Sequence, residues 1–186
     1  ITRPTSMLLP LAVAAVFGYL LGSLPFGYFV ARAKGVNIFE VGSKNPGATN
    51  VLRSGNKAAA VITLVLDAVK GFVPVLLVKL FGKEFGLGDG TVALVGLAAF
   101  LGHLWPVFFK FEGGKGVATA AGVLFGIHWA LGLATLATWA IIAYFFRYSS
   151  LAALAAAAFA PVYYLFGDRV AWYSEKPILL AIFIMS

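Results

Sequence analysis

The sequence predicts an all-α integral membrane protein, a single domain over residues 1–186 built as a bundle of about seven transmembrane helices, some of them short. Of the 186 residues, 61% are hydrophobic and only 11% are charged, and the mean hydropathy is +0.95. Such a chain has too little polar surface to cover a soluble globule. The apolar residues form long uncharged runs, and most basic residues lie in the connections between them.

The first uncharged run lies between Arg3 and Arg32 and contains 28 residues. About 20 helical residues cross a bilayer, so this run predicts one tilted span. A cleaved signal peptide is the alternative, but the apolar residues continue well beyond the small-residue triplet at 12–14. Further apolar segments follow at about 58–78, 91–109, 117–146, 150–167 and 177–186.

The segment 117–146 is too long for one ordinary span, and the basic residues indicate that it crosses twice, turning near 126–132. Two crossings place the loops 32–57, 110–116 and 147–149 on one side, where eight Lys or Arg face two acids. The opposite side carries five basic residues against four acids, so the net charges are +6 and +1. The positive-inside rule then predicts seven crossings, with the amino terminus outside and the basic loops in the cytoplasm.

The sequence contains no cysteine. Disulfides, thiolate metal ligands and a cysteine acyl-enzyme are therefore excluded. No metal site or cofactor is expected. The net charge of +7 is compatible with nucleic acid, anionic lipid or an anionic substrate. Because the basic residues lie in membrane-flanking loops, we expect the lipid bilayer and anionic substrates, and no nucleic acid, as partners.

The first polar loop, "GSKNPGATN" (42–50), interrupts this apolar chain and leads toward a helix. Turn-forming residues before a helix direct backbone N–H groups at a bound anion. Ser43 and Arg53 add a hydroxyl donor and a positive charge. The predicted phosphate-binding residues of the loop are Gly42, Asn45, Gly47, Thr49 and Asn50. The alternative is an ordinary connector that caps a helix with Asn45 or Thr49.

The second polar loop contains "GGKG" (113–116), in which Lys115 adds a charge beside Gly113, Gly114 and Gly116. A nucleotide-binding P-loop requires Ser or Thr after the Gly-Lys pair, and Gly116 stands there instead. The remaining interpretation is a glycine-plus-lysine cradle for an oxyanion. Two such loops on one face indicate two phosphorylated groups, or one group held from both sides.

Four ionisable residues lie within apolar segments. Asp67 and Lys70 are three residues apart and can neutralise each other on one helical face. A functional role and a structural ion pair both remain open. His103 is either a proton acceptor or an interfacial hydrogen-bond donor to a loop carbonyl, whereas we expect His128 to anchor the opposite interface.

Four stretches together resemble the bacterial acyl-phosphate:glycerol-3-phosphate acyltransferases, the PlsY family of membrane enzymes: "LGSLPFGYFVA" (21–31), "GSKNPGATNVLR" (42–53), "DAVKG" (67–71) and "GHLWPVFFKFEGGKGVAT" (102–119). The resemblance implies an enzyme of phospholipid biosynthesis in the bacterial inner membrane, with its site facing the cytoplasm. It implies transfer of a fatty acyl group from acyl phosphate to the sn-1 hydroxyl of glycerol 3-phosphate. The products would be lysophosphatidic acid and inorganic phosphate, and no obligate protein partner is evident.

The family also has a third cytoplasmic motif, of the type His-Arg-x-Asn-Ile, after its last span. This chain stops at "AIFIMS" (181–186) before reaching such a motif. Ten apolar residues cannot span a bilayer, so we expect the last helix to be truncated and the chain to be incomplete at its carboxyl end.

An acyl phosphate is an activated anhydride whose leaving group is a stable anion, so the protein needs to supply orientation and positive charge rather than a nucleophile. We expect Lys115, Arg53 and Ser43 to supply this orientation and charge. A phosphate oxygen of the substrate is the expected proton acceptor, with His103 as the second candidate, because neither histidine is followed at the fifth position by Asp. A transporter or flippase for a phosphorylated solute or lipid is the competing class, but no internal repeat supports it.

Overall fold

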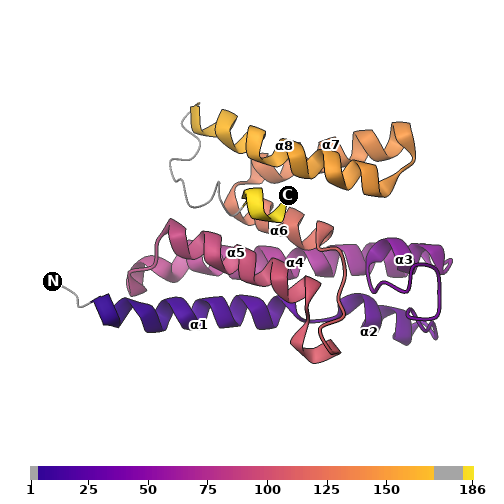
Figure 1. Cartoon of the computed structure of the whole chain (residues 1–186), viewed down its shortest axis with the longest axis horizontal. Helices are drawn as coiled ribbons and strands as arrows, with labels where there is room; N and C mark the ends of the chain where they lie inside the picture. Colours follow the sequence, from indigo (N-terminus) through magenta and orange to yellow (C-terminus); the bar gives the residue numbers. More distant parts are fainter. Residues whose placement is uncertain (1–3, 170–181) are drawn as a thin grey trace.

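The computed structural model describes residues 4–169 and 182–186, and the regular secondary structure in this part of the chain is all helical, with no strand. Figure 1 shows helices that run mostly along one long axis. The elements are α1 (Pro4–Gly22), α2 (Phe26–Ala33), α3 (Ala48–Arg53), α4 (Lys57–Phe81), α5 (Asp89–Leu104), α6 (Val117–Ile127), α7 (Trp129–Phe146) and α8 (Ser149–Arg169), with 3₁₀ turns at Gly82–Phe85 and Val107–Phe109. Residues 182–185 are also helical.

The described helices confirm the predicted all-α membrane fold. Five segments are long and apolar enough to cross a bilayer: Met7–Ala33, Lys57–Phe85, Asp89–Phe109, Trp129–Phe146 and Ser149–Gly167. Helix α6 has only 11 residues, which at about 1.5 Å per residue is shorter than the apolar core of a bilayer. Most of the predicted last span, 177–186, lies outside the described residues. The count of seven crossings therefore stays a prediction.

The first predicted span is two helices rather than one. Pro25 is the break point, because proline has no backbone N–H and disfavours helical geometry in the residue before it. The hydroxyl of Ser23 donates to the carbonyl of Tyr19 at 2.8 Å, and the carbonyl of Leu24 accepts from Lys70 Nζ at 2.8 Å. At this break, the backbone carbonyl of Leu24 is therefore accessible to the charged side chain of Lys70 on α4.

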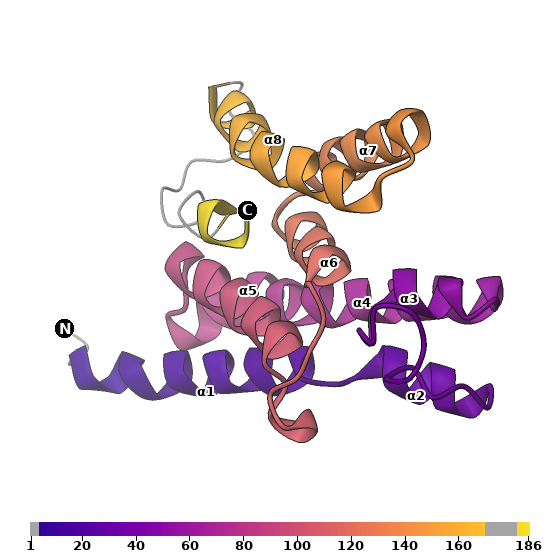
Figure 2. The same ribbon diagram turned by 45° about the vertical axis from the view of Figure 1, so that its right-hand side comes forward.

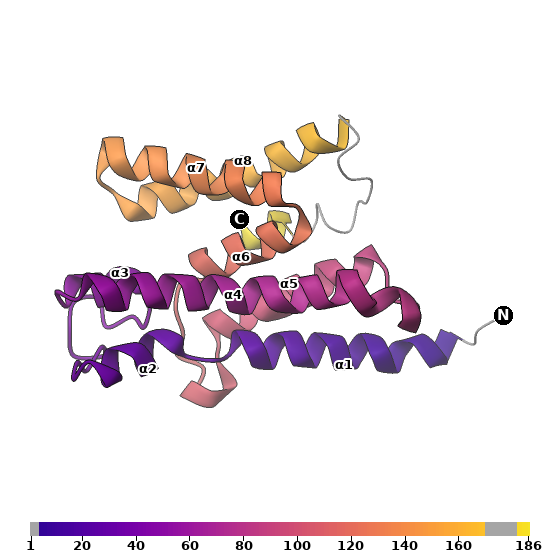
Figure 3. The same ribbon diagram turned by 180° about the vertical axis from the view of Figure 1, so that it is seen from behind.

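The segment 117–146 divides at His128, within the predicted turn at 126–132. The side chain of His128 caps α7 by accepting from the amide of Ala130 at 3.2 Å. Lys79 of α4 caps the carboxyl end of α6: its Nζ donates to the carbonyls of Gly126 at 3.1 Å and Ile127 at 2.6 Å. The α7–α8 connection lies at the same end of the molecule as α2 and α3 (Figures 1 and 3), as the distribution of basic residues predicts.

Helix α4 is central and contacts α1, α2, α3, α5 and α6. Its approach to α6 depends on glycine: a Cβ at Gly71 would collide with the carbonyl of Thr119, and one at Gly122 would collide with the carbonyl of Ala68. Small residues of this kind let membrane helices pack at short distance. Helices α7 and α8 lie side by side as a second layer (Figure 2), and the hydroxyls of Thr138 and Tyr163 lie 2.6 Å apart between them.

Candidate active site

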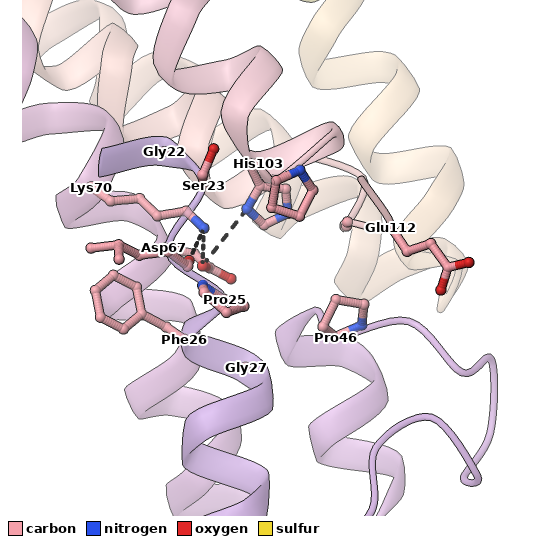
Figure 4. Close-up of a pocket in the computed structure, with 14 residues that line it drawn as sticks. Gly22, Ser23, Pro25, Phe26, Gly27, Pro46, Asp67, Lys70, His103 and Glu112 are labelled. Atoms are coloured by element: carbon pink, nitrogen blue, oxygen red, sulfur yellow. Dashed lines mark hydrogen bonds and ion pairs between the residues drawn. The ribbon is translucent and has the colours of Figure 1, made fainter. Parts of the chain in front are cut away.

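A pocket lies where the break between α1 and α2 meets the middle of α4, the end of α5 and the second glycine loop (Figure 4). The first glycine loop reaches the same pocket through Pro46. The polar side chains in its lining are Ser23, Asp67, Lys70, His103 and Glu112. Residues far apart in the sequence therefore converge at one place.

Buried charges form the floor of this pocket. Lys70 Nζ lies 2.9 Å from Asp67 Oδ1, and the two side chains are only 3% and 4% exposed. The ion pair predicted from their spacing is confirmed. A lysine ammonium has three donors, and a second one binds the carbonyl of Leu24.

His103 joins this ion pair from α5. Its Nδ1 lies 3.7 Å from Asp67 Oδ1 and 3.1 Å from Thr119 Oγ1. The same Thr119 hydroxyl lies 3.0 Å from the backbone carbonyl of Asp67, to which it donates. His103 is buried, and the described contacts of its ring are with Thr119 and Asp67 rather than with a loop carbonyl. The spacing of these residues along the chain does not predict this His–Asp proximity, because it depends on how α4, α5 and α6 pack.

Asn50 holds the first glycine loop together. Its Nδ2 donates to the carbonyls of Ile38 at 3.1 Å and Val41 at 2.9 Å, and its Oδ1 accepts from the amide of Ser43 at 3.0 Å. Gly42 has a φ of +57°, and a Cβ there would collide with Asn50 Oδ1. Gly42 and Asn50 therefore shape this loop, a role that the prediction of phosphate binding did not include.

Of the other predicted residues of the first loop, Asn45 and Gly47 form a turn, and the rest have exposed side chains. Asn45 Oδ1 accepts from the amide of Gly47 at 2.9 Å, as in an Asx turn. Gly47 precedes α3 and no side chain caps that helix, so the capping alternative for Asn45 or Thr49 is wrong. The side chains of Ser43, Thr49 and Arg53 are exposed. Arg53 lines a second surface hollow, together with Glu40, rather than the pocket.

The second glycine loop wraps around His103. The amide of Gly114 donates to the carbonyl of His103 at 3.1 Å, and a Cβ at Gly113 or Gly114 would collide with the backbone or ring of this histidine. Gly116 has a φ of +78° and directly precedes α6. Lys115 is exposed and directly follows two residues that line the pocket. The structure thus brings His103, Gly113 and Gly114 together, with Lys115 next to them.

A prediction follows for Asn50. In Asn50→Ala two carbonyls and one amide lose their partner, at about 1–3 kcal/mol for each polar group that stays buried and unsatisfied. We expect a clear drop in melting temperature in detergent. Thr49→Ala, which removes an exposed neighbouring side chain, is the control and should melt like the wild type. Equal melting temperatures for Asn50→Ala and the wild type would contradict the role of Asn50 in the loop.

Known structures show which class of protein this fold and pocket belong to. The structure is similar to two crystal structures of PlsY (YgiH), described as an integral membrane glycerol 3-phosphate acyltransferase, in its glycerol 3-phosphate form and its lysophosphatidic acid form. The TM-scores are 0.84 and 0.83, with 40% and 39% identical residues, over 95% of this chain and 84% of each solved chain. The protein is an integral membrane acyltransferase.

The family follows from the sequence comparisons. The family model described as glycerol-3-phosphate acyltransferase matches residues 12–186. Two relatives with that name are those of Albidiferax ferrireducens, 63% identical over 95% of this chain and 79% of the relative, and of Bordetella petrii, 58% identical over 94% and 82%. The chain belongs to the glycerol-3-phosphate acyltransferase family.

Proposed function

We propose that the protein transfers a fatty acyl group from acyl phosphate to the sn-1 hydroxyl of glycerol 3-phosphate. Lysophosphatidic acid and inorganic phosphate are the products. Family membership and the titles of the two similar structures support glycerol 3-phosphate as acceptor. The observation that carries the proposal is that both glycine loops border one pocket, through Pro46 from the first and Gly113 and Gly114 from the second. One pocket between two anion-binding loops suits a reaction between two phosphorylated substrates.

The reaction proceeds by direct attack of the glycerol hydroxyl on the acyl carbon, without an acyl-enzyme. The new ester bond forms as the bond to the phosphate oxygen breaks, and phosphate leaves with the electron pair. The chain has no cysteine. The hydroxyl nearest to His103 is that of Thr119, which is buried and donates to a backbone carbonyl, so it is poorly placed to act as a nucleophile. Orientation and charge then carry the catalysis.

Three polar residues of the loops act on the substrates. Lys115 stabilises the oxyanion and the departing phosphate, while Arg53 and Ser43 bind the phosphate of glycerol 3-phosphate. The backbone at Gly113, Gly114 and Gly116 borders the donor, while the side on which a Cβ would lie packs against His103, Phe100 and Leu104. The amide of Gly114 already donates to His103, so the main donors to the oxyanion are other amides of the loop and the Lys115 ammonium.

A phosphate oxygen of the substrate accepts the proton of the attacking hydroxyl, and His103 is the second candidate. The surroundings of His103 support this order. Its Nδ1 faces Thr119 and Asp67, and its Nε2 faces Gly114 closely enough that a Cβ there would collide with it. Nδ1 is therefore already engaged by protein groups, whereas Nε2 lies beside a residue without a side chain.

We place both glycine loops at the cytoplasmic face of the bacterial inner membrane, within one acyltransferase domain that needs no protein partner. The sequence has no cysteine, so single cysteines report the topology. Ser149→Cys should be shielded from an impermeant thiol reagent outside intact cells, whereas Asp89→Cys should be labelled. The opposite pattern would contradict the orientation.

The donor is tested with the purified full chain. We expect acyl phosphate and glycerol 3-phosphate to yield equal amounts of inorganic phosphate and lysophosphatidic acid, and an acyl thioester to yield neither phosphate nor the lipid. Product formation from the thioester alone would overturn the proposed donor. Absence of any product from either donor would overturn the proposed reaction.

A further inference from the structure

We infer that the buried Asp67–Lys70 pair, with His103 and Thr119, positions the two glycine loops relative to each other. These four side chains are the positioning group, and Asp67, Lys70 and Thr119 have no assigned part in the chemistry. The inference rests on the proposed function, since it concerns the alignment of the two substrates that the loops hold.

One set of contacts leads from the positioning group to the second loop. Asp67 Oδ1 lies 3.7 Å from His103 Nδ1, and His103 is the residue on which Gly113 and Gly114 pack. Thr119 connects the same two residues to the first turn of α6, into which the second loop leads. A shift of Asp67 is therefore transmitted to the backbone on both sides of Lys115.

Another set of contacts leads to the first loop. Lys70 Nζ holds the carbonyl of Leu24 at the break between α1 and α2. Helix α2 begins two residues later and packs so closely on the first loop that a Cβ at Gly27 would collide with the carbonyl of Pro46. Lys70 thus fixes the position of the helix on which Pro46 rests. Figure 4 shows Pro46, Lys70, Asp67 and His103 around the same pocket.

A purely structural role would not explain this arrangement well. Replacing a buried ion pair by apolar residues of similar size is often neutral or stabilising, because both charges lose their hydration when buried. Ionisable side chains within a membrane are costly and are mostly found where function requires them. This pair lies where four segments and both loops meet, which is where a fixed geometry serves the reaction.

The main test is the double variant Asp67→Asn/Lys70→Met, which removes both charges and so leaves neither unpaired. We expect it to melt near the wild-type temperature, with kcat lowered on the order of 100-fold, because a misplacement of about 1 Å between reactants has an effect of that size. The apparent KM of each substrate should change by less than about threefold, since each loop keeps its own internal contacts. A wild-type kcat in the folded double variant would overturn the inference.

Lys79→Met is the matched control. Lys79 also lies on α4 and also donates to backbone carbonyls, but at the end of α6 away from the pocket. We expect it to lower the melting temperature and to leave kcat unchanged. A similar loss of kcat in Lys79→Met would show that any loosening of α4 slows the enzyme, and would overturn the specific role of the positioning group.

Thr119→Val covers the case in which the double variant is not recovered folded. It keeps the shape of the side chain and removes only the hydroxyl, and we expect kcat to fall on the order of tenfold. Thr135→Val in α7, which removes a buried hydroxyl bonded within its own helix, should leave kcat unchanged. Equal kcat values for the two threonine variants would contradict the inference.

A distance measurement separates this inference from the proposed function, because it requires no turnover. Spin labels on cysteines at Leu52 and Glu112, both exposed, report the separation of the two loops. The distance distribution should broaden or shift in Thr119→Val and in the double variant, but not in Lys79→Met. An unchanged distribution would overturn the positioning role. If the wild type forms no product while the distribution shifts as expected, only the proposed function fails.

Discussion

Lys115→Ala is expected to remove about 2–4 kcal/mol of transition-state stabilisation and so to lower kcat/KM. This is the usual cost of losing one donor to a developing oxyanion. Lys115 is exposed and directly follows Gly113 and Gly114, which line the pocket. Because its side chain is solvated, the variant should fold and melt like the wild type. The measurement is the rate of phosphate release, with melting in detergent measured in parallel.

The control for Lys115 is Lys110→Ala, which removes the same charge from an exposed position in the same connection. We expect it to keep most of the activity, because Lys110 is not in the glycine loop. An activity of Lys115→Ala within a few-fold of the wild type would contradict the role of this lysine. An equal loss in both variants would mean that the general positive charge of the connection, rather than a placed donor, supports the reaction.

Arg53→Lys should raise the KM for glycerol 3-phosphate on the order of tenfold, although the charge is kept. A guanidinium can bond two phosphate oxygens at once through its planar fork, whereas an ammonium acts as a point charge. Arg53 ends α3, and its Cδ would lie 3.7 Å from a Cβ at Gly42, so the side chain turns back over the first loop. The effect should appear when glycerol 3-phosphate is varied with acyl phosphate saturating.

Arg32→Lys serves as the control for Arg53, since Arg32 is also exposed and bonds the hydroxyl of Tyr28. It should leave both KM values unchanged. Ser43→Ala should weaken glycerol 3-phosphate binding less than Arg53→Lys does, by the roughly 0.5–1.5 kcal/mol of one neutral bond. An unchanged glycerol 3-phosphate dependence in both Arg53→Lys and Ser43→Ala would refute the binding of this phosphate by Arg53 and Ser43.

Much of the fold could be predicted from the sequence, because the membrane imposes a simple pattern on it. Uncharged runs must form helices to satisfy their backbone polar groups, and the basic residues indicate which loops lie together. The charge distribution predicts a turn near 126–132, and the structure divides the segment there, at His128. The same distribution groups Arg147 with the basic loops 32–57 and 110–116. The break at Pro25 differs from the single first span that the apolar run predicts, although a proline inside such a run is a visible signal for a helix boundary.

The site could be predicted only in part, because residue type does not reveal which groups are already satisfied within the protein. Asn50 was expected to contact phosphate, and the structure shows all three of its bonds going to the loop itself. The meeting of Asp67, His103 and Thr119 depends on the close packing of three helices at glycines. Their spacing along the chain contains no such information. Both glycine loops, by contrast, were visible as polar interruptions of an apolar chain.

In the proposed reaction, both substrates are held together between the two glycine loops and react directly. A grid of initial rates for the purified wild type, with acyl phosphate and glycerol 3-phosphate both varied, tests this order of events. The double-reciprocal lines should intersect, because both substrates must be bound before phosphate leaves. Parallel lines, with exchange of labelled phosphate into acyl phosphate in the absence of glycerol 3-phosphate, would indicate an acyl-enzyme and overturn the direct transfer.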